Sequence, residues 1–399
     1  MTGIGRERMV RESTTVVVIG GGPAGLTVAN LLLRLGIGCV VLERQSRARV
    51  EQRQRAGIVE HRAVRMFEEW GLGERVVGGF PHDGLLEFRV DGESRLLDEA
   101  DSTEGLTARL CPQQILVQRL IAACLEDGGD LRFEAADVAI DDPAADRPVV
   151  SYRAADGVRH EISCELVAGC DGDHGVSRAS LPDGALTAYP FDHGIAWLTV
   201  LADSPPPRHP LLGVSEHGFA AHFGRGPHSS RYYVQCPPGD SADDWPDERI
   251  REQLALRLSV AEPVAGPITE KEVFQLRSVV HEPMHHGRLH LVGDAAHIIA
   301  PMGGKGMNLA LYEAEVFARA VRDHVHGDDS GLRSYSEVCL QRAWNYQEFS
   351  RWMTEMVHDA GDDSLAGPFR RRLARARLDR LCSSRAAAGA FAELMAGLA

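Results

Sequence analysis

The sequence predicts an α/β fold in three parts: a parallel-sheet domain, a β-rich domain inserted into it, and a helical C-terminal region. Residues 15–43 read as strand, glycine turn, helix and strand, and residues 191–273 as short strands and turns rich in Pro, Gly and His. After Pro301 the pattern is helical almost to the end. We expect the boundaries 1–187, 188–298 and 299–399, with the strand at 287–297 returning to the first domain.

Composition excludes several classes of protein. The chain has 399 residues, a formal net charge of -14 and a pI near 5.6, which argue against general nucleic-acid binding. Its eight cysteines lie far apart with no CxxC pair, so reduced, buried thiols in a cytoplasmic protein are expected. The apolar run 16–42 is interrupted by GGGPAG and Arg34, so no membrane span is predicted.

The first strand and helix enclose a glycine motif. Gly20, Gly22 and Gly25 form GxGxxG directly after the strand TVVVIG, and Glu43 closes the next strand. This context fits a dinucleotide fingerprint, because glycines let the backbone approach a pyrophosphate at a helix N-terminus and the acid accepts from ribose hydroxyls. We therefore expect a bound adenine dinucleotide; a glycine-rich turn without a ligand is the alternative.

Two later strands, 163–172 and 287–297, share one format, an apolar run followed by glycine and aspartate. The motifs GGGPAG, CDGDHGVSR and LVGDAAH, in this order, resemble the glutathione-reductase-type FAD domain of class A flavin-dependent monooxygenases. The stretches RxRAGIVEH, RYYVQ, GxKGxNLA and FSxWMT are similar to the p-hydroxybenzoate hydroxylase family, and the resemblance covers roughly residues 15–395. These motifs together are far more specific than GxGxxG alone.

The resemblance implies FAD as the cofactor. In the family, the arginines of RxRAG contact FAD phosphates, Gln113 matches a residue that hydrogen-bonds FAD, and Asp294 matches one that contacts the ribityl chain. The glycine turn after Pro301 stabilises negative charge on the flavin through a helix N-terminus. The implied cofactor-binding residues are Gly20, Gly22, Pro23, Ala24, Gly25, Glu43, Arg44, Arg53, Arg55, Gln113, Asp171, Asp294, Gly304, Lys305, Gly306, Met307 and Asn308.

Arg44, Arg47 and Arg49 fall on the segment that faces the adenosine end of the pyridine nucleotide in this family. Three guanidinium groups suit a 2′-phosphate, so NADPH is expected as the electron donor, with NADH as the alternative. A solvated helix face would remove this preference and leave the fold intact. His174 and Arg277 match further NADPH-contacting positions.

The resemblance also assigns a substrate site. Arg225 matches the family's carboxylate-binding arginine, Tyr233 matches its tyrosine partner, and Pro301 matches a proline whose carbonyl abuts the reacting face. These three residues are the expected catalytic group. An aromatic carboxylate would be hydroxylated there through a flavin C4a-hydroperoxide formed with O₂.

Four positions depart from the family pattern. Phe223 replaces a carboxylate-contacting serine, and Met302 replaces a threonine. The tyrosine that accepts the phenolic proton falls near Gly213, and the tyrosine that relays it falls near Leu381. The carboxylate anchor is kept while the route to a para-phenolate is lost, so we expect a different substituted benzoate, such as an amino-hydroxybenzoate.

Other functions stay open at this point. The chain could be a true p-hydroxybenzoate 3-hydroxylase, a flavoprotein oxidase or reductase without hydroxylation, or an idle flavin-binding protein. A homodimer through the C-terminal third is expected from the family. His281, Glu282 and His285 spell HEPMH, but Pro283 and the following strand exclude the helix that the zinc-binding HExxH motif needs, so no metal is expected.

Overall fold

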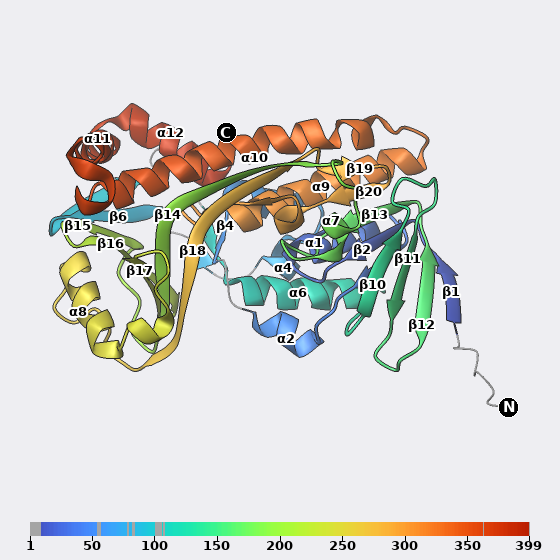
Figure 1. Ribbon diagram of the computed structural model, residues 1–399, viewed down its shortest axis with the longest axis horizontal. Coiled ribbons are helices and arrows are strands. Elements are labelled where there is room, and N and C mark those ends of the chain that lie inside the picture. The colour runs from blue at the N-terminus through green and yellow to red at the C-terminus, as the bar shows by residue number, and fades with distance from the viewer. Residues whose placement is uncertain are drawn as a thin grey trace.

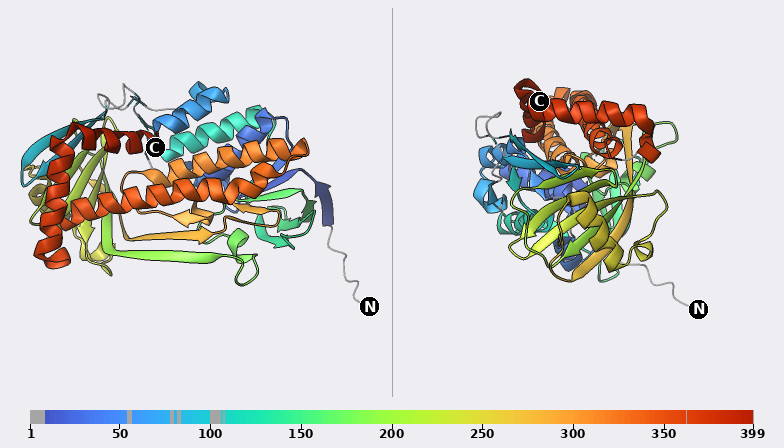
Figure 2. Two further views of the ribbon diagram at one scale, coloured as in Figure 1. Left: turned by 90° about the horizontal axis from the view of Figure 1, so that it is seen from above. Right: turned by 90° about the vertical axis from the view of Figure 1, so that its left-hand side faces the viewer.

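The computed structural model describes residues 9–53, 57–77, 80–81, 84–99, 106, 108–361 and 363–398. The molecule is elongated and has two lobes (Figure 1). One lobe holds the parallel sheet, and the other holds a larger, mostly antiparallel sheet. A two-stranded ribbon and a long helix run along both lobes, as Figure 2 also shows from above.

The parallel sheet confirms the strand–turn–helix–strand reading of residues 15–43. Four of its strands are β-branched or leucine-rich and fully buried, as expected for a sheet covered on both faces. All neighbours pair in parallel except the edge strand β19. The order is β19 (His285–His286), β20 (Leu289–Leu291), β13 (Leu166–Gly169), β2 (Val16–Ile19), β3 (Cys39–Leu42) and β9 (Asp130–Arg132).

Two smaller sheets flank this lobe. One places β1 (Met9–Ser13) beside β12 (Arg159–Ser163), β11 (Val149–Arg153) and β10 (Ala136–Asp141). The other contains the segment that follows the arginine-rich stretch. It joins β4 (Ile58–Val59), β8 (Arg109–Leu110) and β5 (Phe80–Pro81).

The larger sheet has eight strands and carries the expected substrate site. Their order is β21 (His297–Ile298), β18 (Ile268–Glu282), β14 (Thr187–Ala202), β17 (Ser229–Cys236), β16 (Gly218–Gly226), β15 (Leu211–Ser215), β6 (Leu85–Val90) and β7 (Glu93–Asp98). Residues 85–98, which the sequence places in the first domain, thus extend the larger sheet, because β6 pairs in parallel with β15. The other boundaries remain predictions.

Helices cover the parallel sheet and join the lobes. Residues of α10 pack into the core of both lobes, Tyr335 and Cys339 in one and Phe349 and Met353 in the other. No helix among the described residues is long and apolar enough to cross a membrane. The helices are α1 (Pro23–Arg34), α2 (Arg47–Gln52), α3 (His61–Glu69), α4 (Gly73–Val76), α6 (Gln113–Glu126), α7 (Val176–Ala179), α8 (Asp247–Leu258), α9 (Lys305–Val325), α10 (Ser330–Asp359), α11 (Asp363–Ser383) and α12 (Arg385–Ala396).

Candidate active site

The GxGxxG turn has the packing that a dinucleotide site needs. Gly20 has φ +109°, and a Cβ there would lie 2.3 Å from the Cys170 carbonyl oxygen. A Cβ on Gly25 would lie 2.0 Å from the Gly20 carbonyl oxygen, so both positions require glycine. A Cβ added to Gly22, the N-cap of α1, would have no other atom within 4 Å. Open space therefore remains at the helix N-terminus, beside Pro23, where a pyrophosphate would bind.

Glu43 lies at the end of β3, beside this turn. Its two carboxylate oxygens accept hydrogen bonds from the Gly21 and Gln45 N–H groups, each at 2.7 Å. The side chain is thus fixed by the main chain. Because an ionised carboxylate offers about four acceptor directions, capacity remains for the ribose hydroxyls that the fingerprint predicts.

The two later Gly–Asp motifs end neighbouring strands. Asp171 accepts from the Ser177 N–H at 2.8 Å, so its carboxylate holds the turn into α7, and burial raises its pKa. Asp294 lies in the 3₁₀ turn η2 (Gly293–Ala295). A Cβ on Gly293 would lie 2.9 Å from the Ala310 Cβ and 3.5 Å from the Ala24 Cβ. This turn therefore packs between the N-terminal turns of α1 and α9.

The glycine turn before α9 presents a helix N-terminus. Gly303 and Gly304 have φ values of +82° and +64°, and the Gly304 N–H donates to the Pro301 carbonyl oxygen at 3.0 Å. The first N–H groups of α9, from Lys305 through Met307 and including Gly306, have no intrahelical acceptor. Together with the helix dipole they favour a negative charge placed against them.

The Lys305 side chain is fully buried. Its Nζ lies 3.0 Å from a Glu60 carboxylate oxygen and donates to the Leu394 and Met395 carbonyl oxygens. Burial lowers the pKa of Lys305, and the Glu60 carboxylate opposes that shift. The Lys305 ammonium group therefore ties α9 to the end of α12, and its main-chain N–H stays part of the predicted flavin site.

Two other predicted cofactor residues are buried polar groups beside the turn. The Asn308 Oδ1 accepts from the Glu60 N–H at 3.0 Å, and its Nδ2 donates to the Ile58 and Gly304 carbonyl oxygens. Asn308 therefore joins β4 to the start of α9. Gln113 is buried in the first turn of α6, at its first residue.

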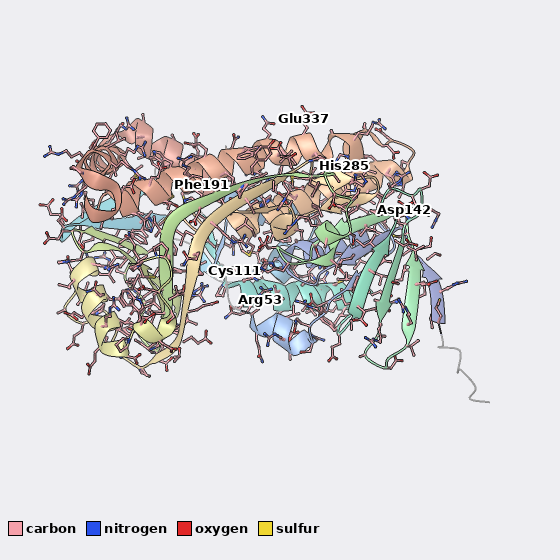
Figure 3. The ribbon with its side chains drawn as sticks, viewed as in Figure 1. Arg53, Cys111, Asp142, Phe191, His285 and Glu337 are labelled. Atoms are coloured by element: carbon pink, nitrogen blue, oxygen red, sulfur yellow. The ribbon has the colours of Figure 1, made fainter. Side chains whose placement is uncertain are left out.

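The arginine-rich stretch lies on α2 and the loop that follows. Arg53 is the C-cap of α2 and is labelled in Figure 3. Arg55 lies outside the described residues. Arg44, Arg47 and Arg49 are exposed, and Arg47 is paired with Glu51 at 2.6 Å. The exposed segment can meet a phosphate, although Glu51 offsets part of its charge.

His174 and Arg277, from different elements, meet at one carboxylate. Arg277 on β18 forms an ion pair with Asp173, and the exposed His174 ring nitrogen Nε2 lies 3.6 Å from the same oxygen. Arg178 binds the other Asp173 oxygen at 3.1 Å. Burial opposes charge on Asp173, but Arg277 and Arg178 lower its pKa. Asp173 therefore places two of the predicted NADPH residues side by side.

Arg225 lies against the RxRAG element. A Cβ on Gly57 would lie 2.5 Å from its Nη1, so the guanidinium packs directly on that glycine. Burial, followed by the nearby Arg231, lowers the pKa of Arg225 to about 10, while a hydrogen bond with Tyr233 raises it. The group still carries its charge at neutral pH. A buried cation of this kind is strongly stabilised by a bound carboxylate.

Aromatic side chains form a wall beside Arg225. The Tyr233 ring centroid lies 4.8 Å from that of Trp197 and 5.9 Å from that of Phe223. Trp197 Nε1–H donates to His358 Nε2 at 2.7 Å, and His358 Nδ1–H donates to the Thr354 carbonyl oxygen at 2.7 Å. Burial lowers the pKa of His358 to about 3, so the ring is neutral and fixes the indole.

Gly213 lies on the face of β15 that packs against α8. A Cβ there would lie 2.4 Å from the Arg257 carbonyl oxygen of α8, so this position faces away from the aromatic wall. Its neighbours Leu212 and Val214 face the wall, in one apolar cluster with Trp197. Met302 and Leu381 are buried in the same cluster. The side of the site that the family lines with hydroxyl groups is apolar in this chain.

Sequence reasoning missed three features: the His358 support of Trp197, the nearness of Arg231, and the contact of Gly57 with Arg225. Arg231 and Tyr233 are two residues apart on β17, and side chains two residues apart lie on the same face of a strand. Strand periodicity alone could therefore have placed both on one face. The other two contacts join segments distant in sequence and leave no local signal.

The open helix N-terminus at Gly22, the fixed Glu43 carboxylate and the α9 glycine turn fit a flavin dinucleotide, and the fold and site define an FAD-dependent flavoprotein. The family model described as FAD binding domain matches residues 13–350.

Similar proteins of known activity show which family of FAD-dependent flavoproteins this is. The chain is 37% identical over 396 residues to p-hydroxybenzoate hydroxylase of Acinetobacter baylyi, covering 98% of this chain and 96% of that protein. A 3-(3-hydroxy-phenyl)propionate/3-hydroxycinnamic acid hydroxylase of Mycobacterium avium is 27% identical over 327 residues, 77% of this chain and 54% of the relative. The solved p-nitrophenol 4-monooxygenase of Pseudomonas putida has a TM-score of 0.82 at 20% identity, covering 97% and 98% of the two chains. The chain therefore belongs to the p-hydroxybenzoate hydroxylase family of FAD-dependent aromatic hydroxylases.

Proposed function

We propose that this enzyme hydroxylates the ring of a small aromatic carboxylic acid, a substituted benzoate such as an amino-hydroxybenzoate, with NADPH as electron donor and O₂ as oxygen source. The observation that carries the proposal is the buried Arg225 guanidinium, held between Gly57 and Tyr233. It supplies one fixed positive charge for one carboxylate.

The surrounding residues orient the ring and exclude water. Trp197, Phe223 and Tyr233 form one side of the ring site, and the neutral His358 fixes the indole. Bound FAD, once reduced, supplies the oxygen-activating chemistry. The N-terminus of α9 stabilises negative charge there, and a dry apolar site limits loss of the activated oxygen to water.

The apolar side of the site favours a ring that needs no deprotonation. The side chains of Leu212, Val214 and Leu381 have no hydrogen-bond acceptor, and the Met302 thioether is only a weak one. An amino group donates electron density to the ring without losing a proton. We therefore favour an amino-hydroxybenzoate over p-hydroxybenzoate itself, which is the alternative substrate.

For the electron donor, Arg44, Arg47 and Arg49 supply positive charge for a 2′-phosphate, and Asp173 orders two further predicted contacts, His174 and Arg277. A cytoplasmic location and a homodimer through residues 299–399 complete the proposal, on the strength of the family resemblance.

The proposal is tested with purified holoenzyme in air. NADPH and NADH oxidation are measured with benzoate, p-hydroxybenzoate, protocatechuate and amino-hydroxybenzoates, and products are identified by mass. We expect one amino-hydroxybenzoate to stimulate NADPH oxidation most and to gain one oxygen atom. Rapid, fully coupled turnover of p-hydroxybenzoate would instead support the alternative substrate, and oxidation without any hydroxylated product would support an oxidase.

A further inference from the structure

One buried ionisable pair lies directly behind the Gly293–Asp294 turn. The side chains of Glu313 on α9 and His297 on β21 are 0% and 1% exposed. One Glu313 carboxylate oxygen lies 2.5 Å from His297 Nε2, and the other accepts from the Gly293 N–H at 2.6 Å. A single carboxylate therefore binds both ends of the turn from 293 to 297.

The turn that this pair holds lies beside the two helices expected to bind FAD. Gly293 packs against Ala24 at the start of α1 and Ala310 on α9, the two helices whose N-termini face the proposed FAD site. Ala310 and Glu313 are three residues apart, so they lie on one face of α9. The Tyr335 hydroxyl also donates to the Leu291 carbonyl oxygen at 2.8 Å, just before the turn. The turn is thus held by side chains of α9 and α10.

The electrostatics make the two side chains dependent on each other. Among the described residues, His297 is the basic side chain that forms an ion pair with Glu313. Burial opposes charge on His297, but the Glu313 carboxylate, followed by Asp294, raises its pKa. Other titratable groups also lie close: Arg178, which donates to the Ala295 carbonyl oxygen at 2.8 Å, and His281 near the turn, and Cys170, Tyr335 and Cys339 near Glu313. Removing either side chain would leave the other buried without its oppositely charged partner.

We propose that Glu313 and His297 are positioning residues for FAD. The pair holds the 293–297 turn in place, and with it Asp294 and the main chain against which the cofactor binds. This inference rests on the FAD site and on no assumption about the aromatic substrate, so it can fail while the proposed function stands.

The test is Glu313→Gln in the holoenzyme. An amide cannot accept from both the Gly293 N–H and the His297 N–H, because one of its two terminal atoms is a donor. We expect the dissociation constant of FAD, measured by release of fluorescent free FAD on dilution, to rise about 10-fold or more, as the loss of one hydrogen bond to a charged group would give. The visible circular dichroism of the bound flavin should change as well, and Glu313→Asp should restore part of both.

Glu315→Gln is the matched control. Glu315 is also buried on α9, but it faces Arg62, Arg319 and Trp70 and not the turn. This variant should lose stability and keep FAD affinity. If Glu313→Gln does not fold, His297→Asn, which keeps a hydrogen-bonding side chain and removes the charge, should weaken FAD binding in the same direction. FAD affinity and flavin circular dichroism that stay unchanged in a variant with lowered thermal stability would show a purely structural role and overturn the proposal.

Discussion

Replacing Gly57 by alanine should move the proposed substrate anchor without removing it. The new Cβ would lie 2.5 Å from Arg225 Nη1 and 3.1 Å from its Cζ. Ordinary contact requires the guanidinium to retreat by about 1 Å. Because the clashing atoms are the end of a flexible side chain, the fold should accept the change, and FAD should remain bound.

The expected loss follows from the bonds that the shift breaks. A hydrogen bond between charged partners contributes about 1.5–3 kcal/mol. Breaking one of the two guanidinium–carboxylate bonds should therefore raise the dissociation constant of the aromatic acid roughly 10- to 150-fold. The midpoint of thermal unfolding should change little.

The assay is titration of the holoenzyme with the aromatic acid, followed by the perturbation of flavin absorbance and by stimulated NADPH oxidation. Gly226→Ala is the control, because this glycine adjoins Arg225 and no atom lies within 4 Å of its built Cβ. Equal affinity in the Gly57→Ala variant and the parent enzyme would refute the assignment of Arg225 as the anchor. An equal loss in both variants would show that the clash is not the cause.

Three further predictions concern other parts of the molecule. Lys305→Met should destabilise the protein by about 1–3 kcal/mol in urea unfolding, because the buried Glu60 carboxylate loses Lys305 and keeps Arg342, 3.4 Å away, as its charged partner; an unchanged free energy of unfolding would contradict that role. Phe223→Ser should tighten p-hydroxybenzoate binding about 5-fold by adding one hydrogen bond to the carboxylate, and unchanged affinity would place the substrate elsewhere. The hydrogen bond from Arg132 is the main cause that lowers the pKa of Glu12 to about 2 from 4.5, against the effect of burial. The pair therefore stabilises the fold above pH 4.5, and the loss in Glu12→Gln should shrink between pH 4.5 and 2; a pH-independent loss would contradict this.

Much of the fold could be predicted from the sequence because its signals are local. The buried strand at 16–19, the glycine turn and the helix after it each have their own pattern, and the structure has them in the expected order. Residues 85–98 were misplaced because β6 pairs with β15, more than a hundred residues later, and no local pattern encodes that pairing.

In the candidate site, too, the sequence could not show which way single side chains point. Gly213 was assigned to the substrate site, but side chains alternate along a strand, so an offset of one residue reverses the face. Leu212 and Val214 face the aromatic wall instead. The main-chain role of Lys305 in the cofactor site stays a prediction, whereas the partners of its side chain, Glu60 and the end of α12, are distant in sequence and left no local signal. Arg225 and Tyr233 did come together as expected.

The most direct test of the account is turnover under ¹⁸O₂ with the aromatic acid that best stimulates NADPH oxidation. If the enzyme hydroxylates an aromatic carboxylate held by Arg225, the product carries one ¹⁸O atom on its ring for each NADPH consumed. The stimulation of NADPH oxidation is then lost when the carboxylate is replaced by an amide. Unlabelled acid recovered together with labelled hydrogen peroxide, or equal stimulation by the amide, would contradict the account.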